Sequence, residues 1–183
     1  MLSPRKNSFV LLCLLLACCQ QAELTLEPDT AHGKDTFNPT ETPVGTGAGT
    51  QDCPYTVSDI RAASLPVNEE AWVIGYMVGT ALRSMSNASF SIDASNQTNI
   101  LLSYDSLCTD TSRCIPVELI SDKARRDFSL PANTAHFHRC LLVKGIPSVY
   151  LNRKGLRSIS AGLWLDGFDI STVAPQEWEQ IGL

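Results

Sequence analysis

The chain has 183 residues, with 14 Lys and Arg against 19 Asp and Glu, and a net charge of −5. A surplus of acidic residues argues against a general polyanion-binding protein, because contacts to phosphates need an excess of Lys and Arg. The length is enough for one domain with additional terminal segments, and 44% hydrophobic residues can supply its core.

The N-terminus has the pattern of a signal peptide. Two basic residues precede an apolar run over residues 9–17, which is far shorter than the ~20 residues of a membrane-spanning helix. The segment Leu15–Cys18 resembles a bacterial lipobox, which implies removal of residues 1–17 and a thioether-linked diacylglycerol, with acyl chains such as palmitate, on the Cys18 thiol. We therefore expect a lipoprotein held by Cys18 on a lipid bilayer of the bacterial cell envelope. The alternative is an ordinary secretory signal that is cut and discarded.

Residues 18–53 have the composition of a disordered tether. They are rich in Thr, Pro and Gly, contain six acidic residues and one Lys, and show no apolar periodicity. Such a segment buries too little apolar surface to offset the conformational entropy lost on folding. After removal of the signal the net charge is −7, and most of this surplus lies in the tether.

A helix is expected to start within residues 55–60. Thr56 can cap the amide of Asp59, while Tyr55 and Ile60 have the spacing of a hydrophobic staple.

Five segments enriched in β-branched and aromatic residues are predicted to be strands. Gly75 suggests a bend or bulge in the first, and Pro116 places the third at a sheet edge or bulge. One or two helical turns over residues 121–128 separate the third strand from the fourth. This order indicates a mainly β fold, a small five-stranded OB-like barrel over residues 54–163, with residues 164–183 as an appendage packed on it. The predicted strands are residues 71–79, 99–104, 114–119, 139–146 and 156–161.

Four segments in this order resemble an uncharacterised OB-fold domain family of Bacteroidetes lipoproteins: YTVSDI, AWVIGYMVG, CIPVEL and CLLVKG. The resemblance covers about residues 55–161. It implies an OB-like fold and a periplasmic or cell-surface setting, and it provides no activity to transfer residue by residue. Ile74 stands where this family usually has Lys or a similar residue, which weakens a basic-face interpretation of the first strand.

The OB-like fold predicts where a ligand binds. The usual groove is formed by strands two and three with the loops that join strands one to two and four to five. Residues 113–157 hold nine basic residues against three acidic ones, although such a window is often only a solvated rim, and the tyrosines can be core residues. The candidate ligand-binding residues are Tyr76, Tyr104, Tyr150, Asn152, Arg153, Lys154 and Arg157.

The sequence His136–Cys140 places two imidazoles and a thiol at alternate positions. We expect no metal there, because three ligands within five residues strain a tetrahedral zinc site and Cys140 falls in an apolar strand.

Two kinds of covalent modification are expected in an oxidising compartment. Cys108 and Cys114 bracket five residues and can form a disulfide; with Cys53 and Cys140 three pairings of the four are possible, and we favour Cys108 with Cys114. The resemblance further suggests O-glycans, because Asp-Thr-Ala and Asp-Ser-Leu look like the attachment sites of these bacteria. The two acceptors are Thr30 and Ser106.

The chain carries no nucleophile elbow, nucleotide-binding glycine loop or metalloprotease helix motif. We therefore expect a non-enzymatic binding module without a cofactor, whose partner is an oligosaccharide or an envelope protein. The alternative is a domain that binds single-stranded nucleic acid or assists an extracellular nuclease, which the charge of −7 disfavours.

Overall fold

The computed structural model describes residues 47–62 and 69–170, all of which belong to the unit Asn38–Leu183. The predicted signal peptide with Cys18, the tether up to residue 46 with Thr30, and residues 171–183 of the predicted appendage lie outside the described residues. Within the described part, none of the helices has the length and apolar character that a membrane span requires.

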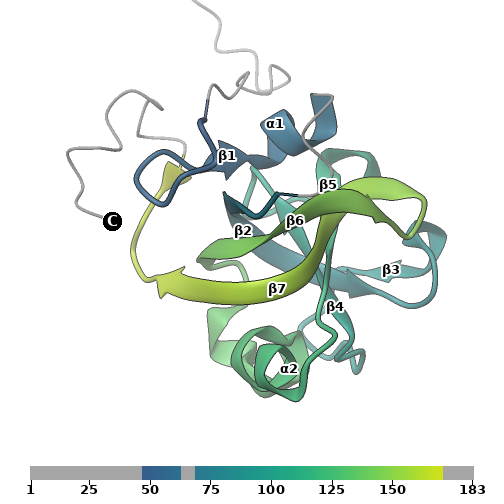
Figure 1. Ribbon diagram of the computed structural model, residues 1–183. Helices are drawn as coiled ribbons and strands as arrows, with labels where there is room; N and C mark the ends of the chain where they lie inside the picture. The colour runs from purple at the N-terminus through teal and green to yellow at the C-terminus, as the bar shows by residue number, and fades with distance from the viewer. Residues whose placement is uncertain (1–46, 63–68, 171–183) are drawn as a thin grey trace, which may run out of the picture. The chain divides into compact units, whose positions relative to one another are not determined.

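Five strands form a closed barrel (Figure 1). β2 pairs antiparallel with β4, β4 antiparallel with β5, β5 parallel with β7, β7 antiparallel with β6, and β6 antiparallel with β2. The predicted mainly β, five-stranded OB-like barrel is therefore confirmed. The barrel strands are β2 (Ala71–Ala81), β4 (Asn99–Ser103), β5 (Cys114–Glu118), β6 (Cys140–Tyr150) and β7 (Arg153–Leu165).

Two short strands lie outside the barrel and pair with β2. β1 (Tyr55–Thr56) runs parallel to its first half, and β3 (Ala88–Ser89) runs antiparallel to its end. The polar connection between the first two predicted strands therefore contains a strand that its Ser and Asn content did not reveal.

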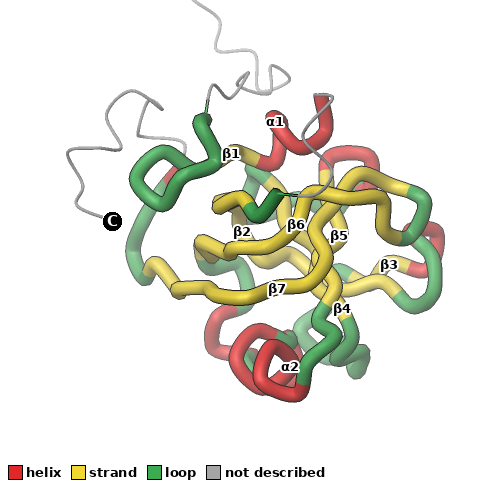
Figure 2. Tube along the Cα trace, in the orientation of Figure 1, coloured by secondary structure: helices red, strands yellow, loops and turns green. Residues whose placement is uncertain are grey.

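The helices lie outside the barrel, with α1 and α2 on opposite sides of it (Figure 2). In α1 (Val57–Ala62), Thr56 and Asp59 form the expected cap: the Asp59 amide donates to Thr56 Oγ1 at 3.2 Å, and the Thr56 amide donates to Asp59 Oδ2 at 2.7 Å. Ser121 caps α2 (Asp122–Phe128). Among the described residues, the complete single-turn 3₁₀ helices are η1 (Met85–Asn87), η2 (Thr111–Arg113), η3 (Leu130–Ala132) and η4 (Thr134–His136).

Alternate residues of β2 fill two hydrophobic clusters. Val73 and Met77 point into the barrel and pack with residues of every barrel strand and both α-helices. Ile74, Tyr76 and Val78 point outward and are also buried, in a second cluster that we call the outer cluster. Its other fully buried members are Ala81, Met85, Leu101, Cys108, Cys114, Cys140, Leu142, Leu165 and Ile170.

The irregularity in the first barrel strand lies at a different residue from the predicted one. The register of β2 against β4 shifts between Met77 and Gly79, not at Gly75. The absence of a Cβ at Gly75 instead makes room for α1, since a Cβ there would lie 2.8 Å from Val57 Cγ2.

The last two strands are longer than predicted. Leu151 and Asn152 alone form the turn between β6 and β7, with φ of 50° and 58°, a two-residue turn that follows the twist of the strands. The predicted strands, residues 139–146 and 156–161, instead left residues 147–155 between them. β7 also continues to Leu165, so Trp164 belongs to the barrel.

The final residues of the expected tether are folded. Within residues 47–53, the Ala48 amide donates to Cys53 O, and the Trp72 amide of β2 donates to Gly49 O, both at 2.8 Å. Residues 47–53 are therefore part of the folded domain.

Substitution of two glycines by alanine tests how closely the barrel is packed. A Cβ at Gly155 would lie 2.1 Å from Pro116 O, a backbone atom of β5, whereas the nearest atom at Gly75 belongs to a side chain. We expect Gly155→Ala to lower the free energy of unfolding by about 2–4 kcal/mol and Gly75→Ala by roughly half of that, because a side chain can shift and a paired strand cannot. Urea denaturation checks this, and an equal or smaller loss for Gly155→Ala would contradict the account of the β5–β7 contact.

Candidate functional site

Part of the predicted ligand-binding set comes together at the β6–β7 hairpin. Tyr150 pairs directly with Arg153, and the Arg157 guanidinium lies 5.9 Å from the centroid of the Tyr150 ring. Arg157 also donates to both carboxylate oxygens of Glu118, at 2.8 and 3.3 Å, which raises the pKa of its guanidinium. Arg157 is thus held between a carboxylate and a ring, while Asn152 occupies the turn and Lys154 pairs with Val149 in the ladder.

Tyr76 and Tyr104 lie elsewhere. Tyr76 pairs with Cys140, at the opposite end of β6 from Tyr150, and only 7% of its surface is exposed. Its hydroxyl donates to Asp169 Oδ1 at 2.7 Å and accepts from the Ile170 amide at 2.8 Å. Burial and the Asp169 hydrogen bond raise the pKa of Tyr76. Tyr104 is half-buried against the same outer cluster, and burial raises its pKa as well.

The outer face of the second and third barrel strands is closed. All five residues of β4 and all of β5 except Glu118 are buried. The outward side chains Leu101 and Cys114 belong to the outer cluster, together with Met85 and Cys108 from the adjoining connections. The open strand face on which the sequence interpretation placed part of the ligand groove is therefore absent, because the chain itself covers it.

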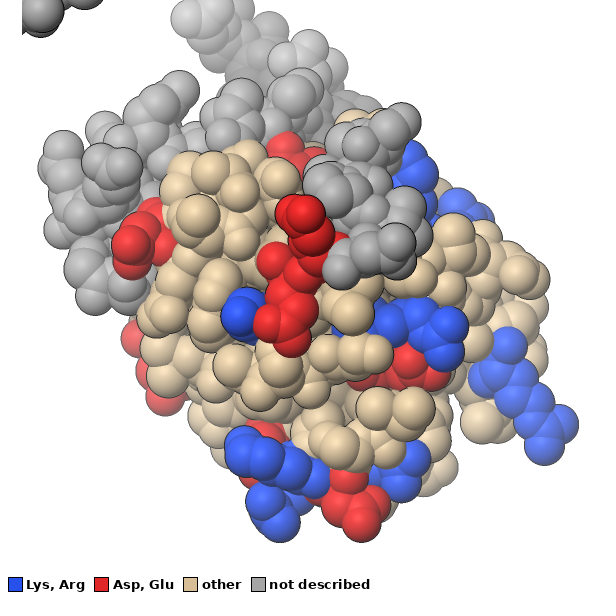
Figure 3. Space-filling view, viewed as in Figure 1, with Lys and Arg blue, Asp and Glu red and all other residues tan. Residues whose placement is uncertain are grey.

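The basic window does not form a basic surface. At least six of its nine basic residues form ion pairs with carboxylates. On the face drawn in Figure 3, basic and acidic side chains lie next to one another instead of forming one continuous basic area. The six paired residues are Arg113, Lys123, Arg125, Arg126, Lys144 and Arg157.

A groove of about 660 Å³ lies on the connection from β2 to β4, the first of the two loops expected to contact a ligand. Asn99 shapes it: its side-chain oxygen accepts from the Ala81 amide at 2.8 Å, and its side-chain nitrogen donates to Ala81 O at 2.7 Å. Asn96 also donates to Ala81 O, at 2.8 Å. Gly79 lets β3 approach closely, since a Cβ there would lie 2.2 Å from Ser89 O. We call this feature the 80–97 groove; it is lined by Thr80, Leu82, Asn87, Ser89, Asp93, Ala94, Ser95, Asn96 and Gln97.

Sequence reasoning expected a ligand near this loop but singled out none of the residues that line the 80–97 groove. The signal available was the concentration of Ser and Asn in this connection, which is also typical of an ordinary loop. The groove depends on how the two ends of the connection are tied to Ala81, and that is a property of the folded structure.

A smaller pocket of about 240 Å³ lies beside the start of β6. It is lined by His138, Arg139, Cys140 and the segment that follows β7. Tyr76 and Ser106 also line it, and His138 Nδ1 hydrogen-bonds to Ser106 O.

The side chains of His136, His138 and Cys140 do not meet at one point in the structure. His136 stacks on Trp164 with ring centroids 4.4 Å apart, whereas His138 contacts the 104–108 loop and Cys140 is buried in β6. Among the residues that the structure describes, no group of three or more His, Cys, Asp or Glu is placed to hold a metal ion.

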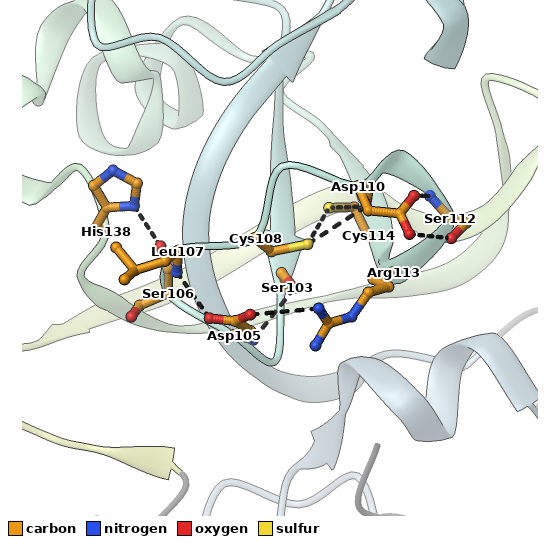
Figure 4. Close-up of polar contacts among 10 residues, drawn as sticks. All are labelled: Ser103, Asp105, Ser106, Leu107, Cys108, Asp110, Ser112, Arg113, Cys114 and His138. Carbon is orange, nitrogen blue, oxygen red and sulfur yellow. Dashed lines mark hydrogen bonds and ion pairs between the residues drawn. The ribbon is translucent and has the colours of Figure 1, made fainter. Parts of the chain in front are cut away.

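The two cysteines expected to pair lie side by side. Cys108 Sγ and Cys114 Sγ are 3.9 Å apart, and both are free thiols (Figure 4). Ser106, the predicted glycan acceptor on the same loop, is half-buried.

The Tyr76 hydroxyl fixes the segment after β7. We expect Tyr76→Phe to lower the free energy of unfolding by about 1–2 kcal/mol, because Asp169 and the Ile170 amide each lose a hydrogen-bond partner. Since the folded-state pKa is raised, the contribution of this hydroxyl is complete below its usual pKa of about 10, falls as the pH rises above that value, and is lost once the pH passes the folded-state value. The stability difference between the two proteins should therefore shrink by about 1 kcal/mol between pH 9 and 11. Denaturant titrations at both pH values measure it; a constant difference would contradict the assignment.

Comparison with known proteins gives a family without a known activity. Neither the curated proteins nor the solved structures contain a match to this chain. Residues 55–165 match a family model described as a domain of unknown function (DUF6359). The matched segment begins at the first residue of β1 and ends at the last residue of β7, so the family domain coincides with the barrel and its N-terminal strand and helix. The chain belongs to the DUF6359 family.

Proposed function

We propose that this protein is a non-enzymatic binding domain of the bacterial cell envelope, which takes up an oligosaccharide in the 80–97 groove and is held at the membrane through acylated Cys18. The chemistry of the groove lining is the observation that carries the choice of ligand. Six of its nine side chains bear hydroxyl or amide groups, and Asp93 is the one charged residue among the nine.

This lining suits a neutral ligand rich in hydroxyl groups. Hydroxyl and amide side chains both donate and accept hydrogen bonds, as a sugar ring requires. Leu82, which is 57% exposed, offers an apolar surface for the C–H face of a ring. Ligand sites commonly combine such apolar contact with a few directional polar groups.

The distribution of charge favours a sugar over single-stranded nucleic acid. Binding to a nucleic acid backbone requires cations that are available to phosphates, whereas six of the nine bases in the basic window contact carboxylates. The nine residues that line the groove include neither Lys nor Arg.

Binding to an array of neutral oligosaccharides tests the ligand class. The full chain in detergent should bind specific sugars on the array, and its affinity for them should barely change between low and high salt. The double variant Asp93→Ala, Gln97→Ala changes two exposed groove residues and should weaken binding by about tenfold or more, as expected for the loss of one or two hydrogen bonds.

The double variant Arg153→Ala, Lys154→Ala is the matched control, because both residues are exposed and lie on the hairpin. It should leave sugar binding unchanged. Salt-sensitive binding of a short DNA strand that this control abolishes would replace the proposal with the nucleic acid alternative. Absence of sugar binding, or equal binding by both double variants, would overturn it.

The membrane anchor requires a separate test. With Cys18→Ala in the full chain we expect the protein to leave the detergent phase and the membrane fraction, because acyl chains supply the affinity for the bilayer. Mass spectrometry of the wild-type N-terminal peptide should show a lipid-modified Cys18. A Cys18→Ala protein that still fractionates with membranes through its N-terminus would contradict this part of the proposal.

A further inference from the structure

The loop between β4 and β5 brings two buried thiols together. Cys108 and Cys114 are 2% and 3% exposed, and their sulfur atoms lie 3.9 Å apart. Both thiols also point at the carbonyl oxygen of Asp110, at 3.4 and 3.3 Å (Figure 4). A disulfide bond is about 2.05 Å long, so the sulfurs need to approach by roughly 2 Å to form one.

Contacts that do not involve sulfur hold this loop in place. The Cys108 amide donates to Asp105 O at 3.1 Å, and Asp105 Oδ1 accepts from the Leu107 amide at 2.9 Å. Arg113 reaches Asp105 Oδ2 at 3.5 Å, and Asp110 caps η2 by accepting from the Ser112 amide. Cys108 and Cys114 are therefore neighbours before any bond joins them, which lowers the entropic cost of joining them.

The other described cysteines are not alternatives. Cys140 pairs with Tyr76, Tyr76 with Ser103, and Ser103 with Cys114. Along this path, two strands, β2 and β4, separate Cys140 from Cys114. Cys53 is half-buried in the N-terminal turn.

We propose that Cys108 and Cys114 form an intramolecular disulfide by exchange with a disulfide-bearing oxidant, either a small disulfide or a protein thiol oxidase. In the first step one cysteine thiolate attacks the oxidant disulfide, forms a mixed disulfide and releases one thiol. In the second, the other cysteine attacks the protein sulfur of the mixed disulfide and releases the second thiol. The two cysteines lose two electrons and two protons, and the oxidant disulfide is reduced to two thiols.

The two thiols have different roles in this sequence. Cys108 lies between two exposed residues, Leu107 and Thr109, whereas Cys114 begins β5. A thiol in an exposed loop reaches an oxidant after a smaller local opening than a thiol in a paired strand, and burial with the neighbouring Cys108 also raises the pKa of Cys114. Cys108 therefore reacts first with the oxidant, and Cys114 resolves the mixed disulfide.

Oxidised glutathione is the probe for this proposal. The folded full chain is incubated with it, alkylated without reduction and digested with trypsin, which cleaves after Arg113, between the two cysteines. We expect one disulfide-linked pair of peptides, residues 84–113 with residues 114–123. Oxidation should raise the Tm by about 5–10 °C. Cys108→Ser and Cys114→Ser should each abolish this rise, and Cys140→Ala, the matched control for a buried thiol, should keep it.

The order of reaction has its own readout. Cys114→Ser should accumulate a stable glutathione adduct on Cys108, whereas Cys108→Ser should form an adduct on Cys114 far more slowly. The reverse order would overturn the assignment of roles. Linkage of either residue to Cys53 or Cys140, or alkylation of both thiols after oxidation of a wild-type protein that remains folded, would overturn the disulfide itself.

Discussion

The fold depends on β2, which hydrogen-bonds along both edges and is buried on both faces. Its residues 71–76 pair with β6 and its residues 76–79 pair with β4, so this one strand closes the barrel. Nearly every side chain of β2 is buried, because one face lines the barrel and the other supports the outer cluster. A polar side chain introduced on either face of β2 would lose its hydration, and it would need a buried partner such as the one that Tyr76 has in Asp169.

The outer cluster determines where a ligand can bind. In an OB-like barrel the exposed face of the second and third strands is the usual binding surface, but here Leu101 and Cys114 on that face are buried under the chain's own connections. Under the proposed function, a ligand would therefore contact the loops instead of the strand face. The connection between β2 and β4 both covers the barrel and forms a groove of its own.

Sequence patterns predicted the strand order well because it depends on local composition. The five runs of β-branched and aromatic residues and the cap formed by Thr56 and Asp59 are all short-range signals. The connection between β6 and β7 was predicted too long, because Leu151 adopts a positive φ without being Gly or Asn and so gives no turn signal. A mainly polar, irregular segment likewise gave no indication that Met85 and Phe90 would cover the barrel.

The candidate site was less predictable than the fold, because it depends on partners distant in sequence. Tyr76 bonds with Asp169, 93 residues later, and Arg157 with Glu118, 39 residues earlier. Neither pairing leaves a pattern in the local sequence. Tyr76, a candidate stacking ring, therefore turned out to hold the segment after β7 by hydrogen bonds. Basic residues of the 113–157 window likewise turned out to form ion pairs with carboxylates. The proximity of Cys108 and Cys114 was predictable because only five residues separate them.

The contact between β5 and β7 gives the barrel a seam. A single parallel bridge, Val117 with Leu156, joins these strands, whereas β6 and β7 pair over most of their length. Gly155 reaches the seam only because it has no Cβ to meet Pro116 O. Residues at a seam with so few ladder hydrogen bonds contribute little until the flanking pairs have formed, so the seam should close late in folding and open first when the native barrel fluctuates. The barrel would then behave as a curled sheet whose edge strands, β5 and β7, part briefly. Water would reach the interior side of β7 during such an opening, whereas β2, which is paired along both edges, would stay covered.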